Sequence, residues 1–191
     1  MNDNAADATP AAPEARPHID WQEWGPDAFD RARREDKLVL LDIGATWCHW
    51  CHVMDRETYD DPEVADVVSR RFVPVRLDRD RQPEIDAHFQ RAPALIDTRA
   101  GGWPLTVVLA PGGEVVFKGT FIPPRAGPPR GAQAGLLDVL DHVEGVWRTR
   151  RDEISQAGRQ LADQARQAAR QAAEMPGRLC ERIVADIAAG I

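Results

Sequence analysis

Two cysteines separated by two residues are the most reactive feature of this sequence of 191 residues. Cys48 and Cys51 have the spacing of a pair that can cycle between a dithiol and a disulfide. They follow an apolar run at residues 38–43, which is typical of a buried strand, so we expect them where a strand ends and a helix begins. The free backbone N–H groups and the dipole of a helix start stabilise a thiolate. This context predicts a redox-active site.

The residues around the pair suggest separate roles in disulfide exchange. Cys48 is expected to attack a substrate disulfide, and Cys51, one helical turn later, to be shielded and to resolve the mixed disulfide. His49 lies between them and, when protonated, would stabilise the Cys48 thiolate. Trp47 and Trp50 would frame the site and cover it with apolar surface.

Two positions outside the motif fit the same chemistry. Asp42 lies in the apolar run, and a buried carboxylate is costly unless it has a task or a partner. It would accept a proton from Cys51 through a water, or it would be tied to a nearby lysine or backbone N–H. Pro104 follows Trp103 at the start of a predicted strand. A cis bond there would let residue 103 pair with a substrate backbone, whereas a trans bond would mark an ordinary edge-strand proline.

The same residues are also compatible with haem or zinc chemistry. C-x-x-C-H describes a haem attachment site in which His52 is the axial ligand. Haem attachment of this type normally follows export, and residues 1–17 lack the basic start and apolar stretch of a secretory signal. The four cysteine and histidine side chains of residues 48–52 are too crowded along one helix to form a tetrahedral zinc site alone. We therefore predict no metal and no cofactor.

The composition limits the class of partner. The net charge is −7 and no basic stripe is present, so nucleic acid is not expected as a partner. The longest apolar runs are too short to span a bilayer, so no membrane partner is expected either. Three cysteines, two of them in one C-x-x-C, fit a reducing compartment with a single redox pair, and we expect the cytoplasm.

The elements that must position the site alternate between helices and strands. Helices are predicted at residues 26–34, 48–57, 62–70, 83–89 and 133–173. Strands are predicted at residues 37–43, 72–78, 104–109 and 114–118, with Pro74 unusual inside its strand. A βαβ unit followed by a hairpin and a closing helix is thioredoxin topology. We expect an α/β, thioredoxin-like fold, a central mixed sheet flanked by helices, with a long C-terminal helical extension.

A charged segment between two of these elements has two interpretations. Residues 78–86 contain four acids, which could suggest a metal site. The acids alternate with Arg79 and Arg81 and can pair with them, so we interpret the segment as a solvated loop.

The C-terminal helix also has two interpretations. Leu140, Trp147, Ile154 and Leu161 recur every seven residues, the spacing of a coiled-coil or partner-docking seam. Arg150 interrupts the stripe and fewer than four clean heptads are present. This favours a first half that packs on the sheet as the closing helix, with residues 160–173 projecting or lying over the surface.

Four separated motifs resemble the thioredoxin superfamily and, within it, the N-terminal thioredoxin-like domain of the spermatogenesis-associated protein 20 family. They are CHWCHVM at residues 48–54, DRDRQPEID at 78–86, GGWPL at 101–105 and GTFIPP at 119–124. The resemblance covers about residues 18–155. It implies a thioredoxin fold, a redox-capable C-x-x-C and a cis bond before Pro104.

The resemblance also informs the domain organisation. Members of that family carry a second, larger α/α-barrel domain. We expect a disordered tail at residues 1–17, a thioredoxin-like domain at 18–155 and a helical extension at 156–191. The extension is either the start of a second domain that this sequence lacks or a free terminus.

These observations predict a thiol–disulfide oxidoreductase. Its partners would be a protein or small-molecule disulfide and a thiol reductant or reductase. The alternative is a thioredoxin-fold binding module that recognises a protein partner without turnover.

Overall fold

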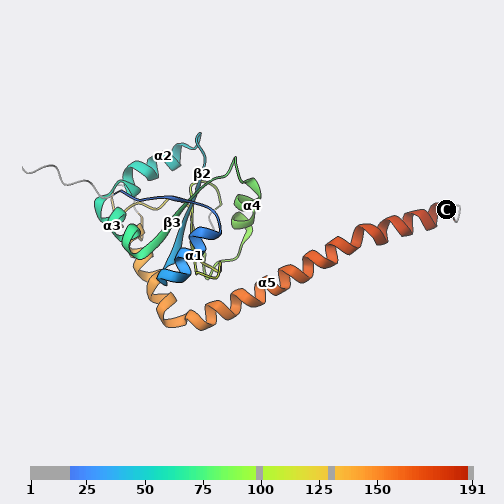
Figure 1. The fold of residues 1–191 in the computed structure, drawn as a ribbon. Helices are drawn as coiled ribbons and strands as arrows, with labels where there is room; N and C mark the ends of the chain where they lie inside the picture. Colours follow the sequence, from blue (N-terminus) through green and yellow to red (C-terminus); the bar gives the residue numbers. More distant parts are fainter. Residues whose placement is uncertain (1–17, 98–100, 129–131, 189–191) are drawn as a thin grey trace, which may run out of the picture.

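A computed structural model describes residues 18–97, 101–128 and 132–188, so the predicted tail at residues 1–17 lies outside the described residues. A six-stranded sheet lies between helices (Figure 1). The strands are β1 (Gln22–Glu23), β2 (Leu38–Gly44), β3 (Phe72–Asp78), β4 (Ile96–Asp97), β5 (Leu105–Leu109) and β6 (Val115–Gly119). The helices are α1 (Pro26–Glu35), α2 (His49–Met54), the π-helix η1 (Asp55–Tyr59), α3 (Pro62–Arg71), α4 (Pro83–Arg91) and α5 (Leu136–Ala188).

The sheet has the strand order β1-β3-β2-β5-β6-β4. β2 pairs in parallel with β3, which pairs in parallel with β1. β5 pairs antiparallel with both β2 and β6, and β4 pairs in parallel with β6. A parallel βαβ unit followed by an antiparallel hairpin and a closing helix is thioredoxin topology. The predicted α/β thioredoxin-like fold is confirmed.

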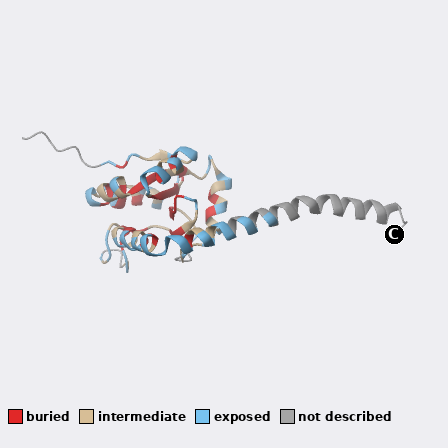
Figure 2. Cartoon of the chain, turned by 60° about the horizontal axis from the view of Figure 1, so that its bottom comes forward, coloured by how far each residue is buried: buried red, intermediate tan, exposed pale blue. Residues whose placement is uncertain are grey.

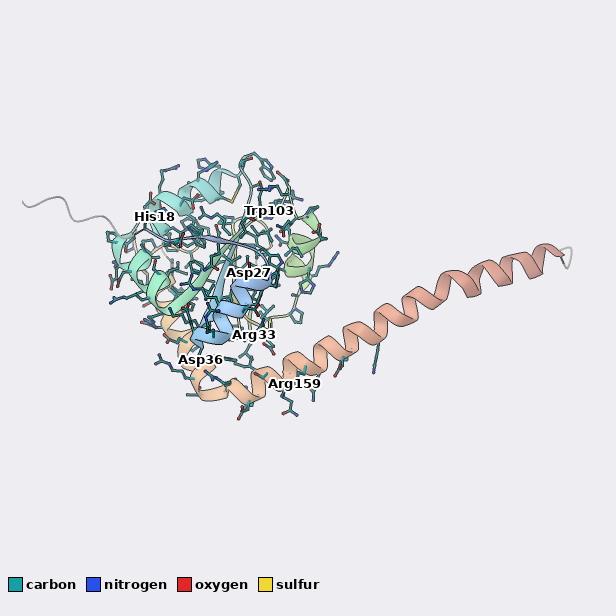
Figure 3. All side chains as sticks on the ribbon, in the orientation of Figure 1. His18, Asp27, Arg33, Asp36, Trp103 and Arg159 are labelled. Carbon is teal, nitrogen blue, oxygen red and sulfur yellow. A yellow bond between two sulfur atoms is a disulfide. The ribbon has the colours of Figure 1, made fainter. Side chains whose placement is uncertain are left out.

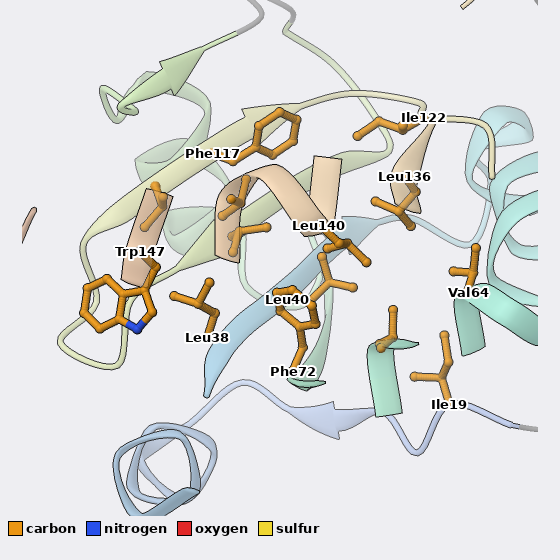
Figure 4. Close-up of a cluster of buried hydrophobic side chains, with 14 of the residues drawn as sticks. Ile19, Leu38, Leu40, Val64, Phe72, Phe117, Ile122, Leu136, Leu140 and Trp147 are labelled. Carbon is orange, nitrogen blue, oxygen red and sulfur yellow. The ribbon is translucent and has the colours of Figure 1, made fainter. Parts of the chain in front are cut away.

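Strand β2 is buried on both sides, which explains its continuous apolar run. Leu38 and Leu40 belong to a core beneath α3 and α5, which we call the first face of the sheet (Figure 4). Val39 and Leu41 belong to a second core with residues of α1 and α4, on the second face. Figure 2 shows buried residues along the sheet and on the inner sides of the flanking helices. Because alternate residues of a strand point to opposite faces, Asp42 and Gly44 share the first face with Leu40.

Pro74 is accommodated within β3 without a break in the strand. It pairs with Leu40 of β2, while β1 reaches only Val75 and Arg76 on the other side of β3. Pro74 therefore lies beyond the end of β1, at a position with edge character, where the missing N–H leaves no ladder bond unmade.

The helix predicted at residues 48–57 is not a uniform α-helix. It is α-helical only at His49–Met54 and continues as the π-helix η1. A π-helix contains an extra residue per turn and occurs often at functional sites. Here it places Thr58 and Tyr59 in the core, where the Thr58 hydroxyl donates to the Ile122 carbonyl at 2.8 Å.

The prediction of an unbroken helix at residues 133–173 is wrong in two respects. The helix begins at Leu136 and continues to Ala188, and Arg150 has non-helical angles (φ −127°, ψ 25°). Leu140, Trp147 and Ile154 are buried against the first face, which supports the closing-helix interpretation, while the side chain of Leu161 lies outside the described residues. Beyond Ile154, the C-terminal part of α5 projects away from the sheet (Figure 1). None of the described helices has both the length and the apolar character needed to cross a bilayer.

Candidate active site

Cys48 and Cys51 lie where β2 ends and α2 begins, and they form a disulfide. Cys48 is the N-cap of α2, with extended backbone angles, and its sulfur accepts a hydrogen bond from the Cys51 N–H at 3.2 Å. A donor from the first helical turn would stabilise a thiolate at this position more than a neutral thiol. The hydrogen bond and the start of the helix therefore both lie on the Cys48 side of the disulfide.

The exposure of the two cysteines differs from the sequence prediction. Cys48 is only 6% exposed, and Cys51 has intermediate exposure. The expectation that Cys51 is the shielded cysteine is therefore wrong for the disulfide form. The physical reason is that the disulfide and the hydrogen bond from the Cys51 N–H draw the sulfur of Cys48 back over the first turn of α2.

Gly44 brings the sulfur of Cys51 close to the backbone of β2. A Cβ atom at residue 44 would lie 3.2 Å from Cys51 Sγ, which is tighter than ordinary van der Waals contact. Asp42 is two residues earlier, on the same face of the strand, about 7 Å along β2. The carboxylate of Asp42 and the sulfur of Cys51 thus lie on the same face of the sheet.

Asp42 is buried and only partly satisfied. One carboxylate oxygen accepts from Arg76 Nε at 3.0 Å, and the other, Oδ1, is buried without a hydrogen-bond partner among the described residues. Burial raises the pKa of Asp42 to about 6, although the positive charge of Arg76 opposes the shift. The cation is an arginine from the neighbouring strand rather than the nearby lysine that the sequence suggested.

Arg76 links Asp42 to the π-helix. Its guanidinium also pairs with Asp55, the first residue of η1, and lies 4.4 Å from the Trp21 ring centroid and 5.6 Å from that of Tyr59. Burial lowers the pKa of Arg76, but the negative charges of Asp42 and Asp55 raise it by a larger amount. The net shift of the pKa is upward, and the guanidinium stays charged. The phenol of Tyr59 is buried beside Asp42, and burial, reinforced by the negative charge of Asp42, raises its pKa. Asp42, Arg76, Asp55 and Tyr59 therefore form a polar cluster between the sheet and η1.

Exposed indole rings flank the disulfide. Trp47 is 58% exposed and Trp50 is 46% exposed. The Trp47 ring packs edge-on against Trp103 at 5.8 Å, and the Trp50 ring packs edge-on against Phe121 at 5.3 Å. The structure therefore brings Trp103, predicted from a distant motif, to the cysteine loop.

The Trp103–Pro104 peptide bond is cis, and Pro104 is buried immediately before β5. Trp103 Nε1 donates to Asp86 Oδ1 at 2.9 Å. Trp103 and the disulfide lie at the same end of the domain (Figure 3).

The two histidines of the motif have different environments. His49 is exposed, and its ring packs edge-on against Trp50 at 5.8 Å. His52 Nε2 donates to the Thr46 carbonyl at 2.8 Å, which ties α2 back to the loop before the cysteines. Among the described residues, no group of three or more histidine, cysteine or acidic side chains is arranged to hold a metal ion.

Sequence reasoning missed the contribution of the charged segment. Asp86 is only 4% exposed, so the interpretation of residues 78–86 as a solvated loop is wrong for this residue. The physical reason is the indole of Trp103, which gives the carboxylate a buried donor. One available signal is helical spacing, because Asp86 lies three residues before the buried Phe89 and thus falls on the inner side of α4.

Comparison with known proteins places these features in a family. The sequence model of the Thioredox_DsbH family, described as a protein of unknown function, DUF255, matches residues 11–166. Spermatogenesis-associated protein 20 from Homo sapiens is 34% identical over 136 residues, which are 71% of this chain and 17% of that protein. The uncharacterized protein B0495.5 from Caenorhabditis elegans is 32% identical over 143 residues, which are 75% of this chain and 19% of that protein. The chain thus spans less than a fifth of the length of these relatives.

Solved structures are similar in outline. A structure described as DsbH oxidoreductase superposes with a TM-score of 0.49 and 17% identity, over 74% of this chain and 91% of that one. A putative disulphide-isomerase from Bacteroides thetaiotaomicron superposes with a TM-score of 0.45 and 26% identity, over 56% of this chain and 83% of that one.

Proposed function

We propose that this chain, which belongs to the Thioredox_DsbH (DUF255) family, is a thiol–disulfide oxidoreductase with Cys48 and Cys51 as its reactive pair. The observation that carries the proposal is the disulfide across the first turn of α2, at the end of β2. A disulfide stabilises a fold mainly by closing a long loop, and this one joins residues only three apart. It therefore adds little as a structural crosslink and is better suited to reversible chemistry.

In the reductive direction, the Cys48 thiolate attacks one sulfur of a substrate disulfide. A mixed disulfide forms between Cys48 and the substrate, and the other substrate sulfur leaves as a thiolate that takes a proton from solvent. Cys51 then gives its proton to Asp42 through a water, and its thiolate attacks the sulfur of Cys48. The second substrate thiolate leaves and is protonated, and the Cys48–Cys51 disulfide remains. The substrate gains two electrons, which an external thiol reductant or reductase restores to the pair.

The surrounding residues take supporting roles in this proposal. His49, when protonated, stabilises the Cys48 thiolate from the exposed side of the helix. Trp47, Trp50 and Trp103 provide apolar surface for the substrate. Pro104 completes the platform on which residue 103 pairs with the substrate backbone.

We further propose that residues 18–155 form the catalytic unit and that residues 156–191 are an extension of it. The substrate is a protein or small-molecule disulfide. The cytoplasm is the proposed compartment, because the three cysteines include a single redox pair rather than a framework of structural disulfides.

A redox titration in graded thiol/disulfide buffers tests the proposal. After alkylation and intact mass measurement, the oxidised protein should carry one label, on Cys180, and the reduced protein three. A reversible two-electron transition is expected, and Cys51→Ser should abolish it. Thiols that all remain alkylatable under every buffer condition would rule out the redox pair.

A binding module without turnover is the second candidate, and the exposed rings of Trp47 and Trp50 are the observation that favours it. Insulin reduction distinguishes the two functions. Turnover that is lost in Cys48→Ser supports the enzyme, whereas wild-type activity indistinguishable from that variant supports the module.

A further inference from the structure

The charged segment that follows β3 holds the aromatic residues beside the disulfide. We call Trp47 and Trp103 the aromatic wall. Arg79, Asp80 and Asp86 contact it from this segment and from α4, and Gln90 contacts the backbone of the neighbouring Gly102. None of them takes part in the proposed electron transfer, so their arrangement calls for a separate explanation.

Asp86 fixes the indole of Trp103. Its Oδ1 accepts from Trp103 Nε1 at 2.9 Å and from Gln90 Nε2 at 3.2 Å. Its Oδ2 lies 3.4 Å from Arg79 Nε, within ion-pair distance but without hydrogen-bond geometry. A buried carboxylate is tolerated only where partners replace water, and here the partners include the indole of the wall. The contact therefore constrains the ring as well as the acid.

Gln90 fixes the backbone next to that ring. Its side-chain amide donates to the Gly102 carbonyl at 3.2 Å and accepts from the Gly102 N–H at 3.3 Å. Gly102 has φ +118°, a conformation that favours glycine. Asp86 and Gln90 are four residues apart on one side of α4, so a single helix face holds two consecutive residues in front of Pro104.

The other half of the wall is held from the preceding loop. Trp47 Nε1 donates to Asp80 Oδ2 at 2.6 Å. The guanidinium of Arg79 lies 4.4 Å from the Trp103 ring centroid and 6.0 Å from that of Trp47, within the range of cation–π attraction. Trp47 remains 58% exposed despite these contacts. The wall thus presents the exposed ring of Trp47, backed by the half-buried ring of Trp103, and both rings are held in place before a substrate arrives.

An ordered aromatic surface lowers the entropy that binding costs, and tryptophan is enriched among residues that dominate binding energy. A small disulfide presents too little apolar area to use two indole rings. A polypeptide can place an apolar or aromatic side chain on the wall while its cysteine reaches Cys48. The surface therefore suits a polypeptide better than a small molecule.

We propose that Asp80, Asp86 and Gln90 are positioning residues that hold the aromatic wall as a binding site for polypeptide disulfides with an apolar side chain near the reacting cysteine. The inference rests on the proposed oxidoreductase function and assigns its substrate class. It places these three residues in substrate binding, not in the transfer of electrons.

The test compares reduction of insulin with reduction of neutral 2-hydroxyethyl disulfide, with dithiothreitol as the recharging reductant. Trp47→Ala should lower kcat/KM for insulin about tenfold through KM and change the rate with the small disulfide less than about twofold. Asp86→Ala should act in the same direction, and Asp86→Asn should recover most of the loss because its amide oxygen still accepts from the indole. Glu84→Ala, exposed on the same helix, is the matched control.

Each result decides between distinct explanations. Equal losses of kcat/KM with both substrates, or an altered redox potential, would show that the substituted residues act on the Cys48–Cys51 pair. Either result would overturn the inference. Because Trp47 is exposed, its variant remains informative even where Asp86→Ala fails to fold. An unchanged ratio of the two activities in Trp47→Ala would likewise overturn the inference. A wild-type protein that reduces neither substrate would overturn the proposed function, and the inference with it.

Discussion

Two buried carboxylates lie near the disulfide, on opposite sides of the sheet. Asp42 is on β2 and points to the first face, whereas Asp86 is on α4, which covers the second face. Asp86 is surrounded by partners, since Trp103 and Gln90 donate to one oxygen and Arg79 lies near the other. Asp42 pairs with Arg76 through one oxygen only, and its other oxygen is buried without a hydrogen-bond partner among the described residues.

The difference between the two carboxylates separates proton transfer from positioning. Asp42 is held by a cation at one oxygen only, and burial raises its pKa to about 6, so it can accept a proton close to neutral pH. A carboxylate whose oxygens both have partners holds its neighbours in place. Its removal leaves those partners unsatisfied and lowers the stability of the protein.

The largest expected effect is on the stability of Asp42→Asn. The pKa of Asp42 is raised from 3.8 to about 6 in the folded protein, so the folded state holds this proton more tightly than the unfolded state. The stabilising contribution is therefore complete below pH 4 and is lost as the pH rises through about 6. Two pKa units correspond to about 3 kcal/mol. The asparagine variant lacks this loss, so its stability relative to the wild type should rise by about that amount between pH 4 and pH 8.

Denaturant unfolding of the oxidised proteins across this pH range measures the effect. Asp86→Asn is the matched comparison, since it replaces a buried carboxylate that is already satisfied. A stability difference between Asp42→Asn and the wild type that stays constant with pH would show that Asp42 is an ordinary structural ion-pair residue.

The second largest effect is expected on the rate at which Cys51 resolves the mixed disulfide between Cys48 and the substrate. Loss of a general base typically costs about a hundredfold in rate, and Asp42→Asn should slow resolution by about that factor. In the wild type the rate should rise with pH through about 6, as the carboxylate ionises. Trapping the mixed disulfide by acid quench and following its decay by mass measures the rate.

Two charged neighbours of Asp42 provide controls for the pH dependence of the resolution rate. The charge of Arg76 lowers the pKa of Asp42 and that of Asp55 raises it. Arg76→Met should therefore move the midpoint to higher pH, and Asp55→Asn to lower pH. A midpoint near pH 6 that persists in Asp42→Asn would assign the titration to another group.

The sequence predicted the position of Cys48 and Cys51 in the fold well because their context is local. The apolar run and the C-x-x-C are separated by only a few residues, so one strand and one helix start decide where Cys48 and Cys51 lie. The alternation of strands and helices was sufficient to predict the fold. The sequence also marked Asp42 as unusual, because a charge in a strand buried on both faces needs an explanation.

The partners of these residues could not be predicted in the same way. Arg76 comes from the neighbouring strand, 34 residues from Asp42, and Asp86 meets an indole 17 residues away. Such contacts depend on strand register and on the direction of each side chain, which a single sequence does not specify. The charged segment illustrates this, since its acids and arginines were matched to one another and the nearby tryptophans were not considered.

Removal of Asp86 should cost stability in contrast to removal of Asp42. Asp86→Ala leaves the Trp103 indole N–H and the Gln90 amide without their buried acceptor, which should lower the free energy of unfolding by about 2 kcal/mol. Asp86→Asn should lose less than half of that, and Glu84→Ala should stay within about 0.5 kcal/mol of the wild type. Denaturant unfolding at pH 7 measures all three variants. A stabilised Asp86→Ala would remove the distinction between the two carboxylates.

The smallest expected effect comes from Asp61, a carboxylate with a conventional structural role. It is the N-cap of α3 and accepts from the N–H groups of Glu63 and Val64 at 3.0 and 3.1 Å. Asp61→Ala should cost about 1 kcal/mol, and Asp61→Asn, which still caps the helix, much less.

The pH dependence of Asp61 should be opposite in sign to that of Asp42. Partial burial raises the pKa of Asp61, but hydrogen bonds from Arg125 and the helix start lower it more, so the net pKa lies below its ordinary value. Its contribution is present above about pH 4 and is lost as the pH falls further. Solvent exposure of the Arg125 pair keeps this dependence small. Unfolding measurements at pH 3 and pH 7 should therefore show the cost of Asp61→Ala shrinking in acid, whereas the gain from Asp42→Asn grows toward neutral pH. The same sign at both positions would show that burial does not outweigh the charge of Arg76 at Asp42, and that both carboxylates titrate as paired structural groups.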